Sequence, residues 1–391
     1  MDGALQAAHD IGISLNNGAV WHHGRCNWIG ALGTASSTSI GTRFGSMGCD
    51  VYGGTSGIAW FLGELFDATG DEVFRQGALG AIRRSLLDSS DTQPTGEGLY
   101  TGALGTAAVA ARLAILLDCD ELADQGLTTA RSHIAPSTGF DLMSGNAGAT
   151  VAYLLLYQAS NDDIFLDLAV AAGERMIRGA AASRGGLSWA SPSLPGRRAL
   201  TGLSHGAAGA AYALIALFEA SGQASFRLAA ESAMEYERSW FDPQAGNWPD
   251  FREVPDTAPP TSRVPYATTW CHGAPGIYAA EVLSERSYVD EAFSCPAHDL
   301  ESSRELERER AWQLFPLPWY RRQRWSIAGR PALASRLRRQ LCRRGQRRRR
   351  CRPGAVRPSW SVVAVRGSWW TESELGDRLG GDRTLLPPHG G

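Results

Sequence analysis

A small-residue signature that recurs five times constrains the fold of this chain more than any other feature. Each copy has the form Gly-x-x-Gly and is followed at once by an apolar stretch rich in Ala and Leu. The copies begin 48, 43, 61 and 67 residues apart. Self-similarity on this scale indicates an architecture built from one repeated supersecondary unit. The five copies are Tyr52–Gly57, Tyr100–Gly105, Met143–Gly148, Ser204–Gly209 and Cys271–Gly276.

The apolar stretches are predicted to be helices, because they are longer than typical strands and poor in β-branched residues. A more polar, amphipathic helix follows most of them. In the first of these, Val73, Phe74 and Ile82 are predicted to share one apolar face with two leucines. The predicted apolar helices cover 58–65, 106–117, 149–157 and 210–218, and the amphipathic ones cover 71–89, 162–181 and 224–241.

Pairs of this kind predict an all-α fold. Helices that are apolar all round are expected inside, with amphipathic helices as an outer layer, so a ring of pairs makes an α/α toroid. The paired glycines fall where each inner helix begins, where they permit close backbone approach. For most of them we favour plain packing over a ligand role. The toroid is predicted to cover residues 45–290, after an N-terminal segment of residues 1–44.

Composition limits the class of protein. The length of 391 residues allows a large core, and 43% hydrophobic with 20% charged residues is typical of a globular chain. No apolar run is long enough to cross a bilayer, and the N-terminus lacks the features of a signal peptide, so a cytoplasmic protein without membrane contact is expected. Seven scattered cysteines, an odd number, argue against a disulfide framework and favour reduced thiols.

Two repeats carry more than glycine. The blocks Gly202–Gly209 and Trp270–Gly276 resemble hallmark motifs of the lanthionine synthetase C-like (LanC-like) family, and Tyr52–Gly57 and Asp141–Gly148 fit its earlier repeats. The resemblance covers about residues 45–285. It implies a toroid of seven helical pairs with a zinc ion at its mouth, which adds cysteine thiols to dehydroamino acids in peptides and so forms thioether rings. The implied partner is a dehydrated precursor peptide or a small thiol.

The resemblance also assigns residues. Cys271 matches a zinc ligand, His205 matches the histidine proposed to transfer a proton, and Asp141 matches its acidic neighbour. Trp270 and His272 are expected to line the cavity, with a direct metal role for His272 less favoured. His205 could instead fill the ring centre or cap its helix, and Asp141 could be only a cap or a partner for the backbone.

One departure leaves other functions open. The cyclases proper carry an arginine four residues before the zinc-binding cysteine, where this chain has Ala267, and Arg263 is out of register. A divergent member is therefore expected. One alternative is a non-catalytic module that binds a thiol or a peptide. Another is an α/α-toroid glycosidase, which would need two acids facing the cavity, and Asp141 has no evident partner.

The pattern stops after Glu285. Residues 1–294 hold 17 of the 38 basic and 31 of the 40 acidic residues, a balance of −14, whereas the remainder has a balance of +12. We reject nucleic-acid binding by this arginine-rich tail, 291–391, and expect it to be poorly ordered. Cys295 and His298 could be imagined as replacement zinc ligands, although their spacing is a weak signal. The family's later Leu-Cys-His-Gly block, which carries the other two ligands, is absent.

A shift of reading frame explains this absence. Tryptophan has the single codon TGG, so reading one base later turns every tryptophan into glycine. In that frame, synonymous codons for Trp312–Trp325 permit Gly-Asn-Ser-Ser-Leu-Cys-His-Gly-Ile-Gly-Gly-Asn-Val-Gly, which contains the missing block. The three glycines are forced, whereas the cysteine and histidine are only permitted. Our hypothesis is a frameshift near residues 286–295.

Overall fold

The computed structural model describes residues 3–32, 43–91, 98–134, 137, 139–259 and 263–283. The predicted tail, 291–391, lies outside the described residues, as do Cys295 and His298. Within the described part, no helix is long and apolar enough to cross a membrane.

The inner helices are where the repeat predicts them, and each begins inside its Gly-x-x-Gly signature. The first glycine of the signature is the extended residue before each of the first four, and helix formation starts at the next residue. All five are strongly apolar, which fits their place inside. The inner helices are α2 (Thr55–Thr69), α4 (Ala103–Leu116), α6 (Asn146–Ser160), α8 (Ala207–Ser221) and α10 (Ala274–Leu283).

An outer helix follows each of the first four inner helices and packs against it. The predicted apolar face of α3 is correct in part: Phe74 and Ile82 are fully buried, but Val73 is 41% exposed, and Ala78 and Ala81 complete the buried face instead. A partner for α10 would lie beyond residue 283. The outer helices are α3 (Glu72–Asp91), α5 (Asp120–Ser132), α7 (Asp163–Gly179) and α9 (Ala224–Arg238).

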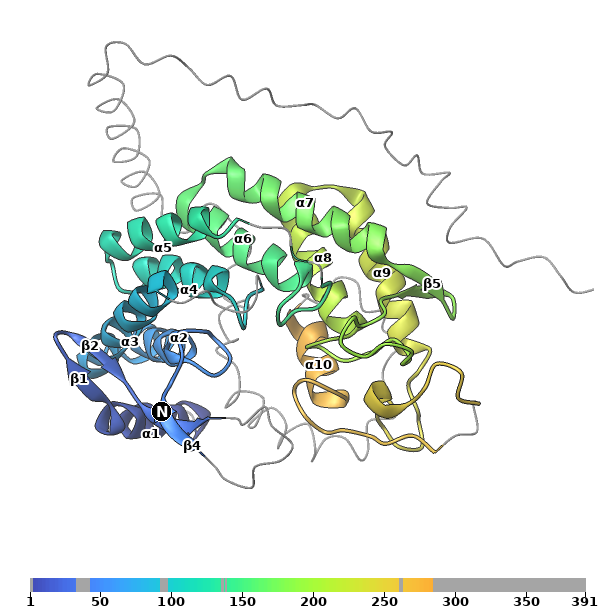
Figure 1. The fold of residues 1–391 in the computed structure, drawn as a ribbon, viewed down its shortest axis with the longest axis horizontal. Helices are drawn as coiled ribbons and strands as arrows, with labels where there is room; N and C mark the ends of the chain where they lie inside the picture. Colours follow the sequence, from blue (N-terminus) through green and yellow to red (C-terminus); the bar gives the residue numbers. More distant parts are fainter. Residues whose placement is uncertain are drawn as a thin grey trace, which may run out of the picture.

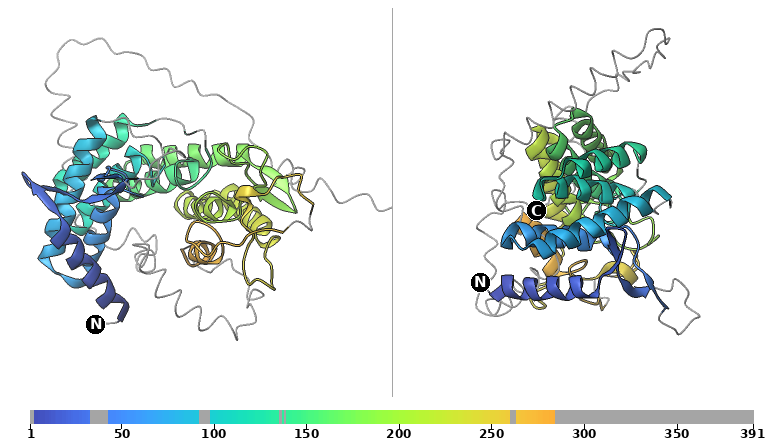
Figure 2. Two further views of the ribbon diagram at one scale, coloured as in Figure 1. Left: turned by 60° about the horizontal axis from the view of Figure 1, so that its bottom comes forward. Right: turned by 90° about the vertical axis from the view of Figure 1, so that its left-hand side faces the viewer.

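The pairs are arranged as an arc, with the inner helices toward its centre (Figure 1). Each inner helix contacts the next, from α2 through α4, α6 and α8 to α10. The left-hand view of Figure 2 places the N-terminal elements at one end of this arc and α10 at the other. The predicted all-α toroid architecture is therefore confirmed, with four complete pairs and the inner helix of a fifth among the described residues.

The second glycine of each signature is required by close packing. In all five repeats, a Cβ on this glycine would lie between 1.8 and 2.3 Å from the carbonyl oxygen six residues earlier. At Gly105, for example, the oxygen is that of Leu99. Since this neighbour is backbone, it cannot move aside as a side chain would. The packing explanation that we favoured for these glycines is thus sufficient at the second position.

The N-terminal segment contains structure that the repeat did not predict. Helix α1 (Gly3–Gly18) packs on α2 and α3. Two antiparallel hairpins follow, and Trp21 and Cys26 of the first lie over Gly80 of α3, where a Cβ would be 2.6 Å from the indole. The strands of these hairpins are β1 (Val20–His22), β2 (Arg25–Asn27), β3 (Ile29–Leu32) and β4 (Arg43–Ser46).

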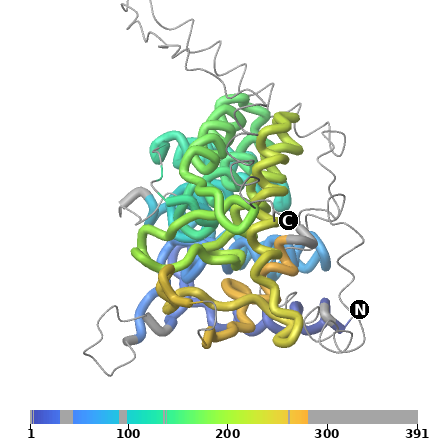
Figure 3. The backbone as a smooth tube through the Cα atoms, turned by 90° about the vertical axis from the view of Figure 1, so that its right-hand side faces the viewer, coloured from blue at the N-terminus to red at the C-terminus, as the bar shows by residue number. Residues whose placement is uncertain are grey.

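Two long segments, one between α7 and α8 and one between α9 and α10, lie at the end of the arc that carries α10. Residues 239–273 lie beside α10 there (Figure 3). They pair with the segment before α8 through a bridge between Arg197 and Pro255, and a short 3-10 helix, η1 (Phe251–Glu253), buries Phe251 beside Leu200. The hairpin of β5 (Ala181–Ser183) and β6 (Gly186–Ser188) packs on α9.

Candidate active site at the loops before the inner helices

The loops before the inner helices are joined to one another by backbone hydrogen bonds. In each case a residue at the start of one repeat donates its N–H to the carbonyl of a residue at the start of the next. These bonds place the polar residues of successive signatures side by side along the arc, where the inner helices begin. The donor and acceptor residues are Tyr52 and Tyr100 (2.9 Å), Tyr100 and Met143 (3.1 Å), Leu142 and Ser204 (3.0 Å), and Ser204 and Cys271 (3.4 Å).

The structure brings Asp141 and His205 together. Asp141 Oδ2 lies 2.9 Å from His205 Nδ1, although 64 residues separate them. The other oxygen, Oδ1, accepts from the N–H groups of Ser144 (2.8 Å) and Gly145 (3.1 Å). Burial opposes ionisation, but these hydrogen bonds outweigh it, so the pKa of Asp141 lies below its usual range. Asp141 therefore both holds the turn before α6 and orients His205.

His272 lies against His205. Their ring centroids are 6.2 Å apart and the rings are nearly parallel, at 26°. His272 is only 6% exposed, whereas the His205 side chain is 37% exposed. Burial lowers the pKa of His272 to about 4, with a smaller contribution from the charge of Arg252. His272 is therefore a neutral, buried neighbour of the pair near neutral pH.

Cys271 lies three residues before α10 with its side chain partly exposed. Its sulfur is 3.2 Å from the Thr269 hydroxyl, and its carbonyl accepts from both the N–H and the hydroxyl of Ser204, the residue before His205. The loop of the fifth repeat is thus fixed directly to the loop that carries His205.

Trp270 fills the space between this loop and the first two repeats. Its ring centroid is 6.0 Å from that of Tyr52 and 5.9 Å from that of Tyr100. Tyr52 is 60% exposed, so the group presents an aromatic face to solvent next to Cys271. The sequence singled out Trp270, but not the two tyrosines, which are the first residues of the first two signatures.

A clasp of residues 247–252 holds the Cys271 loop, and the sequence did not reveal it. Asn247 donates to the carbonyl of Ala267 (3.1 Å) and accepts from the N–H of Ala274 (2.8 Å). Asp250 is nearly buried, and its carboxylate is bound by the guanidinium of Arg252. The N–H of Asp250 donates to the carbonyl of Pro265 (2.8 Å). These residues lie between repeats, where the periodic pattern carries no information.

Arg252 also supplies a cation near the site. Its charge helps to lower the pKa of His272, and its own pKa is raised, chiefly by the hydrogen bond to Asp250. The position where an arginine is expected from the resemblance is Ala267, whose carbonyl would be 1.8 Å from a Cβ at Gly273. Arg263 is exposed on the preceding segment. Of Arg252 and Arg263, it is Arg252 that the clasp fixes beside the loop.

The described residues do not by themselves make a zinc site. Among residues 3–283 that the structure describes, no three His, Cys, Asp or Glu side chains gather closely enough to hold a metal ion. Of the acidic and imidazole groups near Cys271, Asp141 is bonded to His205 and Asp250 to Arg252. A protein zinc site needs at least three ligands, and Cys271 supplies one.

Several solved structures are similar to this chain. Nisin cyclase matches with a TM-score of 0.45 and 17% identity, covering 66% of this chain and 70% of that one. The unsaturated glucuronyl hydrolase of Bacillus sp. GL1 has a TM-score of 0.44 and 16% identity, covering 79% and 83%. A glycoside hydrolase family 76 mannosidase of Bacteroides thetaiotaomicron has a TM-score of 0.44 and 13% identity, covering 77% and 85%.

The family of this chain is shown by its sequence rather than by these structural similarities. The family model described as "Lanthionine synthetase C-like protein" matches residues 45–305, about two thirds of the chain. The match includes all five Gly-x-x-Gly signatures and the residues around Cys271, Asp141 and His205. It ends past the predicted boundary at residue 290, in the part that the structure does not describe. The chain belongs to the lanthionine synthetase C-like family.

Proposed function

We propose that this protein is of the class that adds cysteine thiols to dehydroamino acids and so forms thioether bonds in a peptide, and that this translated form, which lacks the family's Leu-Cys-His-Gly block, is impaired in that activity. The observation that carries the proposal is the Asp141–His205 pair, held at 2.9 Å beside the loop of Cys271. Membership of the family supports this class of reaction. In the reaction, the sulfur of a thiolate bonds to the β-carbon of a dehydroalanine or dehydrobutyrine, and the resulting enolate takes up a proton at its α-carbon.

His205 and Asp141 are suited to the proton transfer. The carboxylate of Asp141 accepts the Nδ1 hydrogen of His205, which leaves Nε2 as the position that exchanges a proton with the substrate. An ionised Asp141 stabilises the imidazolium form between the two steps. His205 removes the proton of the incoming thiol and returns a proton to the α-carbon, so the reaction is balanced without a further acid.

Zinc is expected from the family, but the described residues offer only Cys271 as a ligand. No step of the proposed reaction is therefore assigned to the metal. We propose instead that the remaining Cys-His pair is encoded in the shifted frame of codons 312–325. The DNA from codon 285 onward tests this directly. If codons 312–325 cannot spell Cys-His-Gly one base later, this part of the proposal is wrong.

The function is tested by expressing the chain as given and a frame-restored chain. Each is assayed for bound zinc and for cyclisation of a peptide that contains one dehydroalanine and one cysteine. Ring closure leaves the mass unchanged, so remaining thiols are counted by alkylation with iodoacetamide before mass spectrometry. We expect the restored chain to bind zinc and consume the thiol, and the chain as given to do neither.

Variants of the frame-restored chain test the proposed roles of Cys271, His205 and Asp141. Cys271→Ser is expected to abolish zinc binding, while His205→Asn and Asp141→Asn retain zinc and lose cyclisation. Cys119→Ser is the matched control, because Cys119 is a partly exposed thiol outside the site. Full cyclisation by His205→Asn would refute the proposed proton transfer.

A second candidate, a module that binds a thiol or peptide without reaction, is favoured by one observation. Ala267 stands where the resemblance places an arginine. In the assay above, this candidate corresponds to zinc binding and peptide binding with no loss of free thiol. A glycosidase is less well supported, because the carboxylates of Asp141 and Asp250 are held by His205 and Arg252.

A further inference from the structure

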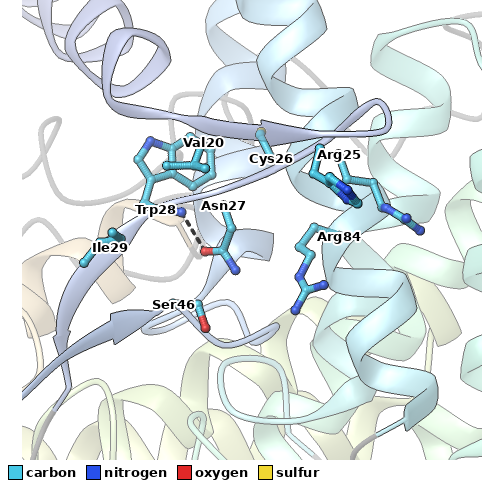
Figure 4. Close-up of a pocket in the computed structure, with 9 residues that line it drawn as sticks. Val20, Arg25, Cys26, Asn27, Trp28, Ile29, Ser46 and Arg84 are labelled. Carbon is cyan, nitrogen blue, oxygen red and sulfur yellow. Dashed lines mark hydrogen bonds between the residues drawn. The ribbon is translucent and has the colours of Figure 1, made fainter.

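A pocket lies on the N-terminal hairpins, apart from the loops that carry Asp141, His205 and Cys271. It encloses about 270 Å³ between the two hairpins and helix α3. For comparison, a cavity of about 150 Å³ in a protein core holds a benzene molecule. Figure 4 shows Val20, Trp28 and Ile29 on one side of this pocket and Arg25 and Arg84 on the other. The pocket therefore has an apolar end and a cationic end.

Its walls are fixed by the fold. Asn27 donates to the carbonyl of Met47 (3.0 Å), which ties the first hairpin to the end of the second. The indole N–H of Trp28 donates to the carbonyl of Leu15 (2.7 Å), and Trp28 is 7% exposed. Cys26, which also lines the pocket, is buried, and its thiol donates to the carbonyl of Gly77 in α3 (3.7 Å). The pocket is thus preformed rather than lined by loose side chains.

The surface around the pocket is unusually apolar. Large exposed hydrophobic residues gather on these two hairpins: Val20 is 60% exposed, Ile29 71% and Phe44 70%. In the register of β3 with β4, Ile29 and Phe44 lie on the same face of the hairpin, because Ala31 is opposite Phe44. An exposed apolar face of this kind marks an interaction site.

The positive charge at the cationic end of the pocket is available to a ligand. Arg25 forms no ion pair with any described residue, whereas Arg84 is paired with Asp88 at 2.8 Å. The pocket therefore has a net positive charge, although residues 1–294 as a whole carry an excess of acidic residues. Such a site attracts an anionic group and rejects a cationic one.

We propose that this pocket binds a segment of the peptide substrate in which a carboxylate side chain lies next to a large apolar one. The proposal rests on the proposed function for the presence of a peptide. Val20, Trp28 and Ile29 receive the apolar side chain, and Arg25, with Arg84, receives the carboxylate. Because the pocket is outside the catalytic loops, the segment bound here is one that does not react. It tethers the peptide and raises its concentration at the site.

Fluorescence anisotropy with a labelled eight-residue peptide of alternating Leu and Glu tests the proposal on the full chain. Peptides of alternating Leu and Lys, and of Ser and Glu, serve as comparisons. We expect the Leu–Glu peptide to bind and both others to bind much more weakly. Arg25→Glu is expected to weaken binding by at least about tenfold, the effect of reversing a charge in contact with a carboxylate.

Two further variants keep the result interpretable. Ile29→Ser removes an apolar wall residue that is already exposed, so it weakens binding without unfolding the protein. Arg83→Glu makes the same charge change next to Arg84, on an exposed position of α3 that does not line the pocket, and should bind as the unaltered chain does. Equal weakening by Arg25→Glu and Arg83→Glu, or no weakening by Arg25→Glu, would overturn the proposal.

The pocket and the proposed reaction can fail separately. Binding that depends on Arg25 in a protein that never consumes the thiol supports the pocket and contradicts the reaction. Cyclisation by the restored chain with no binding of the Leu–Glu peptide supports the reaction and contradicts the pocket. If both hold, joining the Leu–Glu segment to the reactive peptide lowers its KM, and Arg25→Glu removes that advantage with little change in kcat.

Discussion

At the scale of single residues, the site depends on how Asp141 divides its two oxygens. One oxygen fixes the turn before α6 through Ser144 and Gly145, and the other orients His205. From the sequence, a helix-terminal role and a functional role for Asp141 are alternatives, whereas in the structure its carboxylate contacts both the turn before α6 and His205. A carboxylate is suited to this, because it accepts several hydrogen bonds without a donor that would need a partner.

Asp141→Asn is expected to reduce the free energy of unfolding by about 1.5–3 kcal/mol at pH 7, the size of hydrogen bonds to a charged group. The pKa of Asp141 is lower in the folded protein than its usual value, so this contribution is complete above the usual pKa of an aspartate. It is lost as the pH falls through the folded value. Urea titrations from pH 7 to pH 3 should show the two proteins converging in acid.

Asp167→Asn is the control for this measurement, because Asp167 is exposed on the surface of α7 and its side chain forms no hydrogen bond or ion pair with the described residues. It should differ little from the parent chain at every pH. A stability difference between Asp141→Asn and the parent that did not change with pH would contradict an ionised Asp141 in the folded protein.

The described cysteines are expected to differ widely in reactivity. Burial raises the pKa of Cys26 to about 12, and burial with the nearby charge of Asp50 raises that of Cys49. Cys271 and Cys119 are partly exposed. With iodoacetamide at pH 8, Cys271 should be alkylated more than about 100-fold faster than Cys26, since only the thiolate reacts. Peptide mapping over time measures this, and rapid labelling of Cys26 in the folded protein would count against its burial.

At the scale of elements, the sequence predicts the helices of the arc better than what connects them. The Ala- and Leu-rich runs locate the inner helices, because a helix that is buried on all sides carries the strongest apolar signal. Val73 shows the limit of the pattern: it fits the apolar periodicity of α3, yet it is exposed, and small alanines fill the contact instead. The hairpins of the N-terminal segment were missed, because their strands are only three or four residues long.

The site was predictable as a set of residues but not as a geometry. The motifs named Asp141, His205 and Cys271, and the helix repeat implied that their loops meet. The Asn247–Arg252 clasp could not be found in this way. The Asn247 side chain and the backbone N–H of Asp250 bind backbone groups 15 to 27 residues further along the chain, and such contacts leave no period in the sequence.

The close packing of Gly105 at the start of inner helix α4 predicts that a larger residue there destabilises the protein. Gly105→Ala would place a methyl group 1.8 Å from the Leu99 carbonyl, so the loop or α4 must shift. We expect a loss of more than about 2 kcal/mol in the free energy of unfolding, in the range of overpacked cores. Gly179→Ala at the end of α7 meets nothing within 4 Å and should be neutral or slightly stabilising. Urea denaturation of both variants decides this.

At the scale of the whole molecule, the described arc has two ends that lack partners for the bonds joining its loops. Every signature except the last donates a backbone N–H from its start to the carbonyl of the following repeat. At the last loop, the N–H of Cys271 has no acceptor among the described residues. At the first loop, the carbonyl of Tyr52 likewise has no donor there. A closed toroid would supply both, since each loop would then have a neighbour on either side.

Hydrogen exchange on the chain as given and on the frame-restored chain tests this arrangement. In the chain as given, the amide of Cys271 should exchange at least about tenfold faster than those of Tyr100 and Ser204, which are hydrogen-bonded. If the shifted frame encodes the remaining repeats, restoring it provides an acceptor for Cys271, and its amide becomes as protected as the other two. Protection of Ser204 should change little, because its acceptor is already present. A Cys271 amide that is equally protected in both chains would mean that the restored sequence does not continue the arc.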